Sequence, residues 1–229
     1  MDTTFLNARS PMRLLEKGLH GGLGAGNLGL VVAGPGVGKT AFLVGVGLDT
    51  LLRGGHLLHV SLDHTVSHVR TYYDTLFEDL ASSAHLEDEA VTHAEIERRR
   101  SIRAYPRASF SAAKLREAVK IESEAGARPD LLVVEGFDFA AAGPDEVADF
   151  RALAGELDAE MWHSAVCEDE QVTALPAALA AVEERISVIV ALEPAGEHVA
   201  LRALKDHDNP DLSALRVHLD PRTLLLARG

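Results

Sequence analysis

Short runs of consecutive apolar residues alternate along the chain with longer stretches in which apolar positions recur every three or four residues. The apolar runs predict strands that are buried on both faces, as in a parallel sheet covered by helices. The longer stretches predict amphipathic helices, several of which begin at a Ser, Thr or Asp that can cap the first turn. We therefore expect an α/β fold built on a mostly parallel sheet.

The pattern also assigns boundaries to these elements. The predicted strands are Leu28–Ala33, His56–Leu62, Ile102–Tyr105, Leu131–Glu135, Glu160–Ala165 and Ser187–Leu192. The predicted helices are Thr40–Arg53, Thr65–Leu80, Glu89–Arg100, Ser111–Ala125, Asp145–Leu157 and Thr173–Glu184.

The last part of the chain has a different pattern. His198–Leu204, Ala214–Leu219 and Thr223–Ala227 are short, partly alternating segments separated by Asp/Asn/Pro turns. They predict antiparallel strands that finish one edge of the sheet. Because no repeat or low-complexity tract divides the chain, we expect one domain over residues 1–229, with residues 1–26 as a lead-in segment.

Composition and charge narrow the function classes. The chain has 229 residues, of which 47% are hydrophobic, so it can bury a sizeable core and is not globally disordered. Its formal net charge is −13. Such a charge repels phosphate backbones at long range, which argues against non-specific nucleic-acid binding.

Cysteine usage and apolar runs indicate a compartment. The single cysteine, Cys167, cannot form an intramolecular disulfide or a cysteine-based metal site. The N-terminus lacks the pattern of a secretion signal, and the longest apolar runs are too short to span a bilayer. We expect a cytoplasmic protein without a membrane segment.

One motif dominates the candidate chemistry. Residues 33–40 fit the phosphate-binding pattern G-x-x-x-x-G-K-[ST], with Ala33 in the first glycine position. Such a loop folds backbone N–H groups around phosphate, Lys39 would contact the outer phosphates, and the Thr40 hydroxyl would bind Mg²⁺. The predicted ATP contacts are Gly34, Pro35, Gly36, Val37, Gly38, Lys39, Thr40 and Ala41. The alternative is a glycine-rich turn with a surface lysine.

Two acidic positions complete this hypothesis. Glu135 ends a buried strand, where a carboxylate can help hold Mg²⁺, with Asp138 as a possible substitute. The alternative is a strand-end glutamate that faces solvent. Asp63 follows another strand and is the candidate catalytic acid that polarises the attacking water. Alternatively, Asp63 caps the helix that starts near Thr65.

The chain resembles the RecA-fold ATPases, particularly the branch that contains KaiC and the DnaB helicases. The resemblance begins with Pro11–Thr40, which includes the loop, and continues through Arg53–Thr65 and Pro129–Glu135. It ends with Ala203–Pro210 and Leu219–Thr223, similar to the terminal hairpin of that branch. The resemblance implies a RecA-like fold and an ATP site shared between subunits of a homo-oligomer.

The resemblance also assigns roles to individual residues, and some of these residues differ from those of the family. It makes Asp63 the catalytic acid, in place of the family's glutamate, and Glu135 the metal-site acid, in place of the family's aspartate. The trans-acting Lys-x-Arg pair becomes Lys205 and His207, so a permanently charged donor is replaced by an imidazole. Loss of an arginine finger can slow turnover by ~10³ to 10⁵ while leaving binding intact.

We therefore expect a self-associating ATP-binding protein that switches conformation between ATP and ADP and hydrolyses Mg-ATP slowly. The alternative is a non-hydrolysing, nucleotide-dependent scaffold for a protein partner. A DNA motor is less expected, because the loops where this fold binds DNA, near Gly136–Asp145 and Val166–Gln171, contain no basic residue.

Three further features carry weaker hypotheses. A basic cluster formed by Arg98, Arg99, Arg100, Arg103 and Arg107 either complements a helix C-terminus or docks an acidic partner. His64 and His68, beside Asp63, have the i, i+4 spacing of metal ligands but lack a third ligand at characteristic spacing. Trp162 and His163 suggest a core tryptophan and a strand-end histidine, or a sensor of the γ-phosphate.

Overall fold

A computed structural model of the chain describes residues 12–168, 171–172 and 174–228. The strands are β1 (Leu28–Ala33), β2 (Leu57–Ser61), β3 (Arg100–Ala104), β4 (Leu131–Glu135), β5 (Glu160–Val166), β6 (Val188–Ala195), β7 (His198–Asp206), β8 (Val217–Leu219) and β9 (Leu226–Arg228). The α-helices are α2 (Met12–Gly18), α3 (Lys39–Leu52), α4 (Val66–Ala84), α5 (Glu89–Arg99), α6 (Ala112–Glu124), α7 (Pro144–Leu157) and α8 (Ala177–Ala180). Two 3₁₀ turns, η1 (Arg107–Ser109) and η2 (Glu183–Arg185), complete the elements.

All these strands belong to one sheet in the order β3-β2-β4-β5-β1-β6-β7-β8-β9. Strands β3 to β6 of this order pair in parallel, and β7, β8 and β9 continue the sheet with antiparallel pairing. The expected mostly parallel α/β sheet with an antiparallel C-terminal extension is confirmed. Strands β1, β2 and β4 are buried along their whole length, as their continuous apolar sequences predict.

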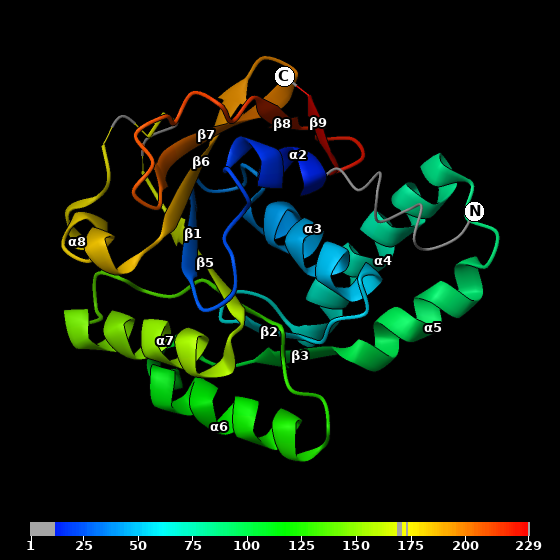
Figure 1. The fold of residues 1–229 in the computed structure, drawn as a ribbon, viewed down its shortest axis with the longest axis horizontal. Helices are drawn as coiled ribbons and strands as arrows, with labels where there is room; N and C mark the ends of the chain where they lie inside the picture. Colours follow the sequence, from blue (N-terminus) through cyan, green and yellow to red (C-terminus); the bar gives the residue numbers. More distant parts are fainter. Residues whose placement is uncertain (1–11, 169–170, 173, 229) are drawn as a thin grey trace.

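Helices cover both faces of the sheet (Figure 1). One core cluster joins α2, α3, α4 and α5 to one face, with Phe42 edge-on to Trp162 at 5.4 Å between ring centroids. The other cluster joins α6, α7 and α8 to the opposite face. Trp162 is 1% exposed, so its prediction as a core residue is confirmed.

The lead-in segment over residues 1–26 contains the helix α2, and its residues 1–11 lie outside the described part of the chain. One local expectation is wrong. The helix predicted over Thr173–Glu184 is only the four-residue α8 and the turn η2; Thr173 itself lies outside the described residues. Pro176 is extended at φ −49° and ψ 144°, which prevents helix formation before Ala177.

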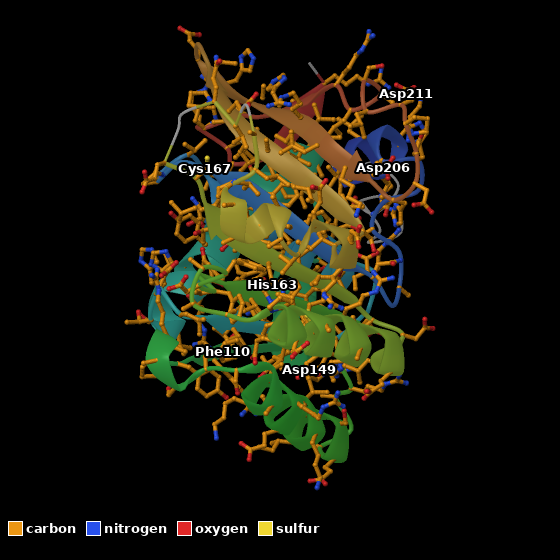
Figure 2. All side chains as sticks on the ribbon, turned by 90° about the vertical axis from the view of Figure 1, so that its left-hand side faces the viewer. Phe110, Asp149, His163, Cys167, Asp206 and Asp211 are labelled. Atoms are coloured by element: carbon orange, nitrogen blue, oxygen red, sulfur yellow. The ribbon has the colours of Figure 1, made fainter. Side chains whose placement is uncertain are left out.

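His163 is a buried histidine without a polar partner. It is 1% exposed within β5, and neither ring nitrogen has a hydrogen-bond partner among the described residues. Its ring contacts Phe137, Phe139 and Phe150, with the ring centroid of Phe150 4.7 Å away. Figure 2 shows His163 inside the molecule, on the side where α7 packs. It is therefore a core residue rather than a strand-end group at the loop.

This burial makes stability depend on pH. Desolvation lowers the pKa of His163 to about 3, whereas an exposed histidine in the unfolded chain titrates near 6.5. As the pH falls from about 6.5 toward 3, the unfolded chain binds a proton that the native chain does not, so stability is lost. We expect a loss of up to about 1.4 kcal/mol per pH unit from this residue.

The variant His163→Phe should lose less of its unfolding free energy than the wild type as the pH falls. Urea unfolding between pH 7 and pH 4 measures the change, and His198→Phe, at an exposed position, is the control that should retain the wild-type slope. Equal slopes in the wild type and His163→Phe would contradict the assignment.

Candidate functional site

The glycine-rich loop lies between β1, which ends at Ala33, and α3, which begins at Lys39. This is the strand–turn–helix context that the motif requires. Gly38 has φ +121°, a backbone conformation that disfavours any residue with a side chain, and a Cβ there would also require Cδ2 of Leu219, 2.9 Å away, to shift. No side chain caps α3, and its first turn contains no acidic residue. Its first N–H groups and positive dipole end are thus open to an anion.

Lys39 lies against this loop. Its ammonium donates hydrogen bonds to the carbonyl oxygens of Ala33 and Gly34 at 3.1 and 2.8 Å. Burial lowers its pKa, and the carboxylates of Glu135 and Asp63 oppose this only in part. An anion in the loop would stabilise the charged form, since opposite charge favours ionisation.

Thr40 and Glu135 meet beside the loop. Strands β1, β2 and β4 are parallel, so their carboxyl ends share one edge of the sheet. The Thr40 hydroxyl donates a hydrogen bond to Oε1 of Glu135, and the Ser61 hydroxyl donates to Oε2 at 3.2 Å. Glu135 is 3% exposed. The alternative of a solvent-facing Glu135 is therefore wrong.

The environment of Glu135 favours its charged form. Burial alone would raise the pKa of this carboxyl group, but the proximity of His59, the Thr40 hydroxyl and His64 outweighs it, so the pKa is lowered. Nε2 of His59 is 3.8 Å from Oε2, and Nε2 of His64 is 4.0 Å from Oε1. A hydroxyl and an ionised carboxylate are oxygen ligands suited to Mg²⁺, and Thr40 and Glu135 fit such an ion by their chemistry.

Asp63 lies at the same edge but is engaged elsewhere. Its Oδ1 accepts hydrogen bonds from the guanidinium of Arg107 in η1, with Nε at 3.0 Å. The helix α4 is capped by Thr65, whose side chain accepts from the N–H of His68. The alternative role of Asp63 as the helix cap is therefore wrong.

The structure also places the candidates Asp138, His64 and His68. Asp138 accepts from the N–H groups of Ala140 and Ala141 in its own loop, so it does not replace Glu135. His64 precedes α4 instead of sharing its face with His68, although their ring centroids are 4.5 Å apart.

Lys205 and His207 lie at the opposite end of the strands. Val188 at the start of β6 pairs with Asp206, and the Lys205 ammonium donates to the carbonyl oxygen of Glu183 at 2.7 Å. Figure 2 shows Asp206 on the far side from Cys167, whose N–H donates to the carbonyl oxygen of Ala33 at the loop. The fold does not bring Lys205 or His207 to the loop of the same chain. A contact with nucleotide is possible only across a subunit boundary.

The basic cluster is paired internally. Arg98 and Arg99 contact Glu95, Arg100 contacts Asp74 and Glu97, Arg103 contacts Glu122, and Arg107 contacts Asp63. These carboxylates compensate the positive charge, which favours a structural role over phosphate neutralisation. Of the acidic segment 168–170, residues 169–170 lie outside the described residues.

One grouping was not anticipated from the sequence. Ligand atoms of Asp74, His93 and Glu97 lie within 4.8 Å of one another across α4 and α5. Arg70 and Arg100 already contact Glu97, so these cations neutralise the carboxylates that a metal would need. The two helices are separated by a turn, and only their packing reveals the cluster.

The described part of the chain contains no helix with the length and apolar character needed to cross a bilayer. No model of a known protein family matches the chain, and no curated protein matches it either. The loop, Lys39, Thr40 and Glu135 form the group of side chains and backbone in which a ligand would find both anion-binding and metal-binding atoms.

Proposed function

We propose that the protein binds Mg-ATP and ADP at residues 34–41, that it is a RecA-like P-loop ATPase of the KaiC and DnaB branch, and that nucleotide switches its conformation. The observation that carries the proposal is the hydrogen bond between Thr40 and the buried Glu135, beside Lys39 and the uncapped start of α3. A solvated glycine-rich turn would not need a buried carboxylate next to its hydroxyl.

Each group has a role in this proposal. The N–H groups of the loop and of the first turn of α3 bind phosphate oxygens, and Lys39 adds a positive charge. Thr40 and Glu135 would hold Mg²⁺, which supplies charge neutralisation for the phosphates. Asp63 would accept a proton from the attacking water or orient it.

Slow hydrolysis of ATP is expected because the catalytic groups are not free to act within one chain. Arg107 engages the Asp63 carboxylate, and Lys205 and His207 lie at the opposite end of the strands. Completion of the site would then depend on a neighbouring copy in a homo-oligomer. The second candidate, a non-hydrolysing scaffold for a protein partner, is favoured by the same Arg107–Asp63 contact if that contact persists with nucleotide bound.

A nucleic-acid motor is the least supported reading. The basic cluster is paired with acidic side chains. Single-stranded DNA should therefore leave phosphate release unchanged at low salt, where electrostatic binding is strongest. We place the protein in the cytoplasm, with a second copy of the chain and an unidentified protein as its partners.

Replacement of Lys39 tests the site. Lys39→Ala should weaken ATP binding in calorimetry by about 10- to 100-fold, because hydrogen bonds from a charged group to phosphate are lost. Lys120→Ala, on the exposed face of α6, is the matched control and should bind as the wild type does. Equal affinities for the two variants would contradict the assignment.

Replacement of Arg107 tests the restraint on Asp63. An exposed ion pair is worth about 0.2 to 1 kcal/mol, so Arg107→Gln should raise steady-state phosphate release by up to about fivefold. Arg103→Gln, which loses its contact with Glu122 instead, is the control. Tight ATP binding with no release above the Lys39→Ala background in any variant would favour the scaffold.

Mixing variants tests the role of Lys205 across subunits. Lys39→Ala and Lys205→Ala should each be inactive alone, whereas an equal mixture should release phosphate, because some sites combine an intact loop with an intact Lys205. Light scattering with and without Mg-ATP reports the assembly on the same samples. A mixture no faster than its components would exclude the trans contact.

A further inference from the structure

His59 stands between a helix and the buried carboxylate of the site. It lies in β2 and is 0% exposed, with Nδ1 3.0 Å from the hydroxyl of Tyr73 in α4. In the pairing of β2 with β4, Ser61 is opposite Glu135, so His59 projects from the same face two residues earlier. Its Nε2 is 3.8 Å from Oε2 of Glu135 and has no hydrogen-bond partner among the described residues.

The tautomer of His59 follows from these neighbours. Tyr73 is fully buried, and burial raises the pKa of its hydroxyl, which keeps its proton. That hydroxyl can donate to Nδ1, which leaves the imidazole proton on Nε2, toward the carboxylate. The other tautomer would place the lone pair of Nε2 against Oε2 of Glu135, which is repulsive.

The position of the Tyr73 hydroxyl is built into the surrounding helices and strands. Gly47 lies in the interior of α3, where glycine costs about 1 kcal/mol relative to alanine. A Cβ at Gly47 would collide with the Tyr73 hydroxyl oxygen. On another side, the guanidinium carbon of Arg100 is 4.9 Å from the centroid of the Tyr73 ring. Glycine at position 47 makes α3 less stable than alanine would, and the Tyr73 hydroxyl occupies the space that an alanine side chain would fill.

We propose that Tyr73 and His59 are positioning residues that orient Glu135 toward the metal position. The inference rests on the proposed function and deepens it. A glutamate has one more rotatable bond than an aspartate, so its carboxylate needs more restraint to keep one orientation. Ser61 donates a hydrogen bond to Oε2 and Nε2 of His59 lies 3.8 Å from the same oxygen, so both favour the orientation that leaves Oε1 at the Thr40 hydroxyl.

The variant Tyr73→Phe tests the proposal, since it removes the hydroxyl and keeps the ring. The measurement is anisotropy of a fluorescent ATP analogue, titrated with Mg²⁺. We expect the Mg²⁺ concentration at half-effect to rise about tenfold, as is typical when a group that orients a metal ligand is lost. Binding of the analogue without Mg²⁺ should not change. Tyr72→Phe, the neighbouring tyrosine on α4, is the matched control.

Two further variants separate positioning from general stability. Gly47→Ala should improve the helix propensity of α3 but displace the Tyr73 hydroxyl, so it should shift the Mg²⁺ midpoint in the same direction. In a Glu135→Gln background, Tyr73→Phe should cause no additional shift. A purely structural role would lower the unfolding temperature and leave the midpoint where the Tyr72→Phe control has it.

The outcomes distinguish this inference from the proposed function. A wild-type protein that shows no Mg²⁺-dependent nucleotide binding overturns both. A wild-type protein with such binding, and a Tyr73→Phe midpoint equal to that of Tyr72→Phe, overturns the positioning role alone.

Discussion

A carboxylate buried at the end of a central strand is stable only when its neighbours compensate its charge, and Glu135 imposes this constraint on the candidate site. Its neighbours come from different parts of the chain: Thr40 lies in the first turn of α3, and Ser61 and His59 belong to β2. Their positions are set by the parallel pairing of β2 with β4 and by the packing of α3 on the sheet.

Basic and acidic side chains lie together at both ends of the parallel strands. At the carboxyl end, the positive charges of Lys39 and Arg107 lie near the negative charges of Glu135 and Asp63. An anion that enters the loop therefore meets side chains whose charges already offset one another. At the other end, Lys205 and His207 line a cavity of about 550 Å³ whose charged lining includes both Arg151 and Arg185 and the acidic Glu184 and Asp208. One copy of the chain therefore presents the loop and the candidate trans-acting residues on opposite ends, as a head-to-tail assembly would require.

Sequence pattern predicted β1 and β4 well because both are nearly continuous apolar runs, which favour burial on both faces. It placed β3 less well, at Ile102–Tyr105 instead of Arg100–Ala104, because this strand is only partly buried and contains two arginines. The sequence pattern predicted too long a helix over Thr173–Glu184. Alanines in this segment do not mark a buried face, and Pro176 restricts the helix to the residues that follow it. The pattern anticipated that Glu135 would meet the loop, since parallel strands end at a common edge. It did not anticipate His59, because a histidine inside an apolar strand has no local signal for its partner.

The sequence by itself determined the α/β class, the strand–loop–helix motif and the acidic residues at the strand ends, because these depend on local periodicity and on glycine, lysine and threonine at fixed spacing. Only the tertiary structure decided which groups meet. The pairing of Arg107 with Asp63, the isolation of His163 among phenylalanines and the contact from Tyr73 to His59 join residues far apart in the chain. Such contacts depend on which faces pack together, and local periodicity does not encode that choice.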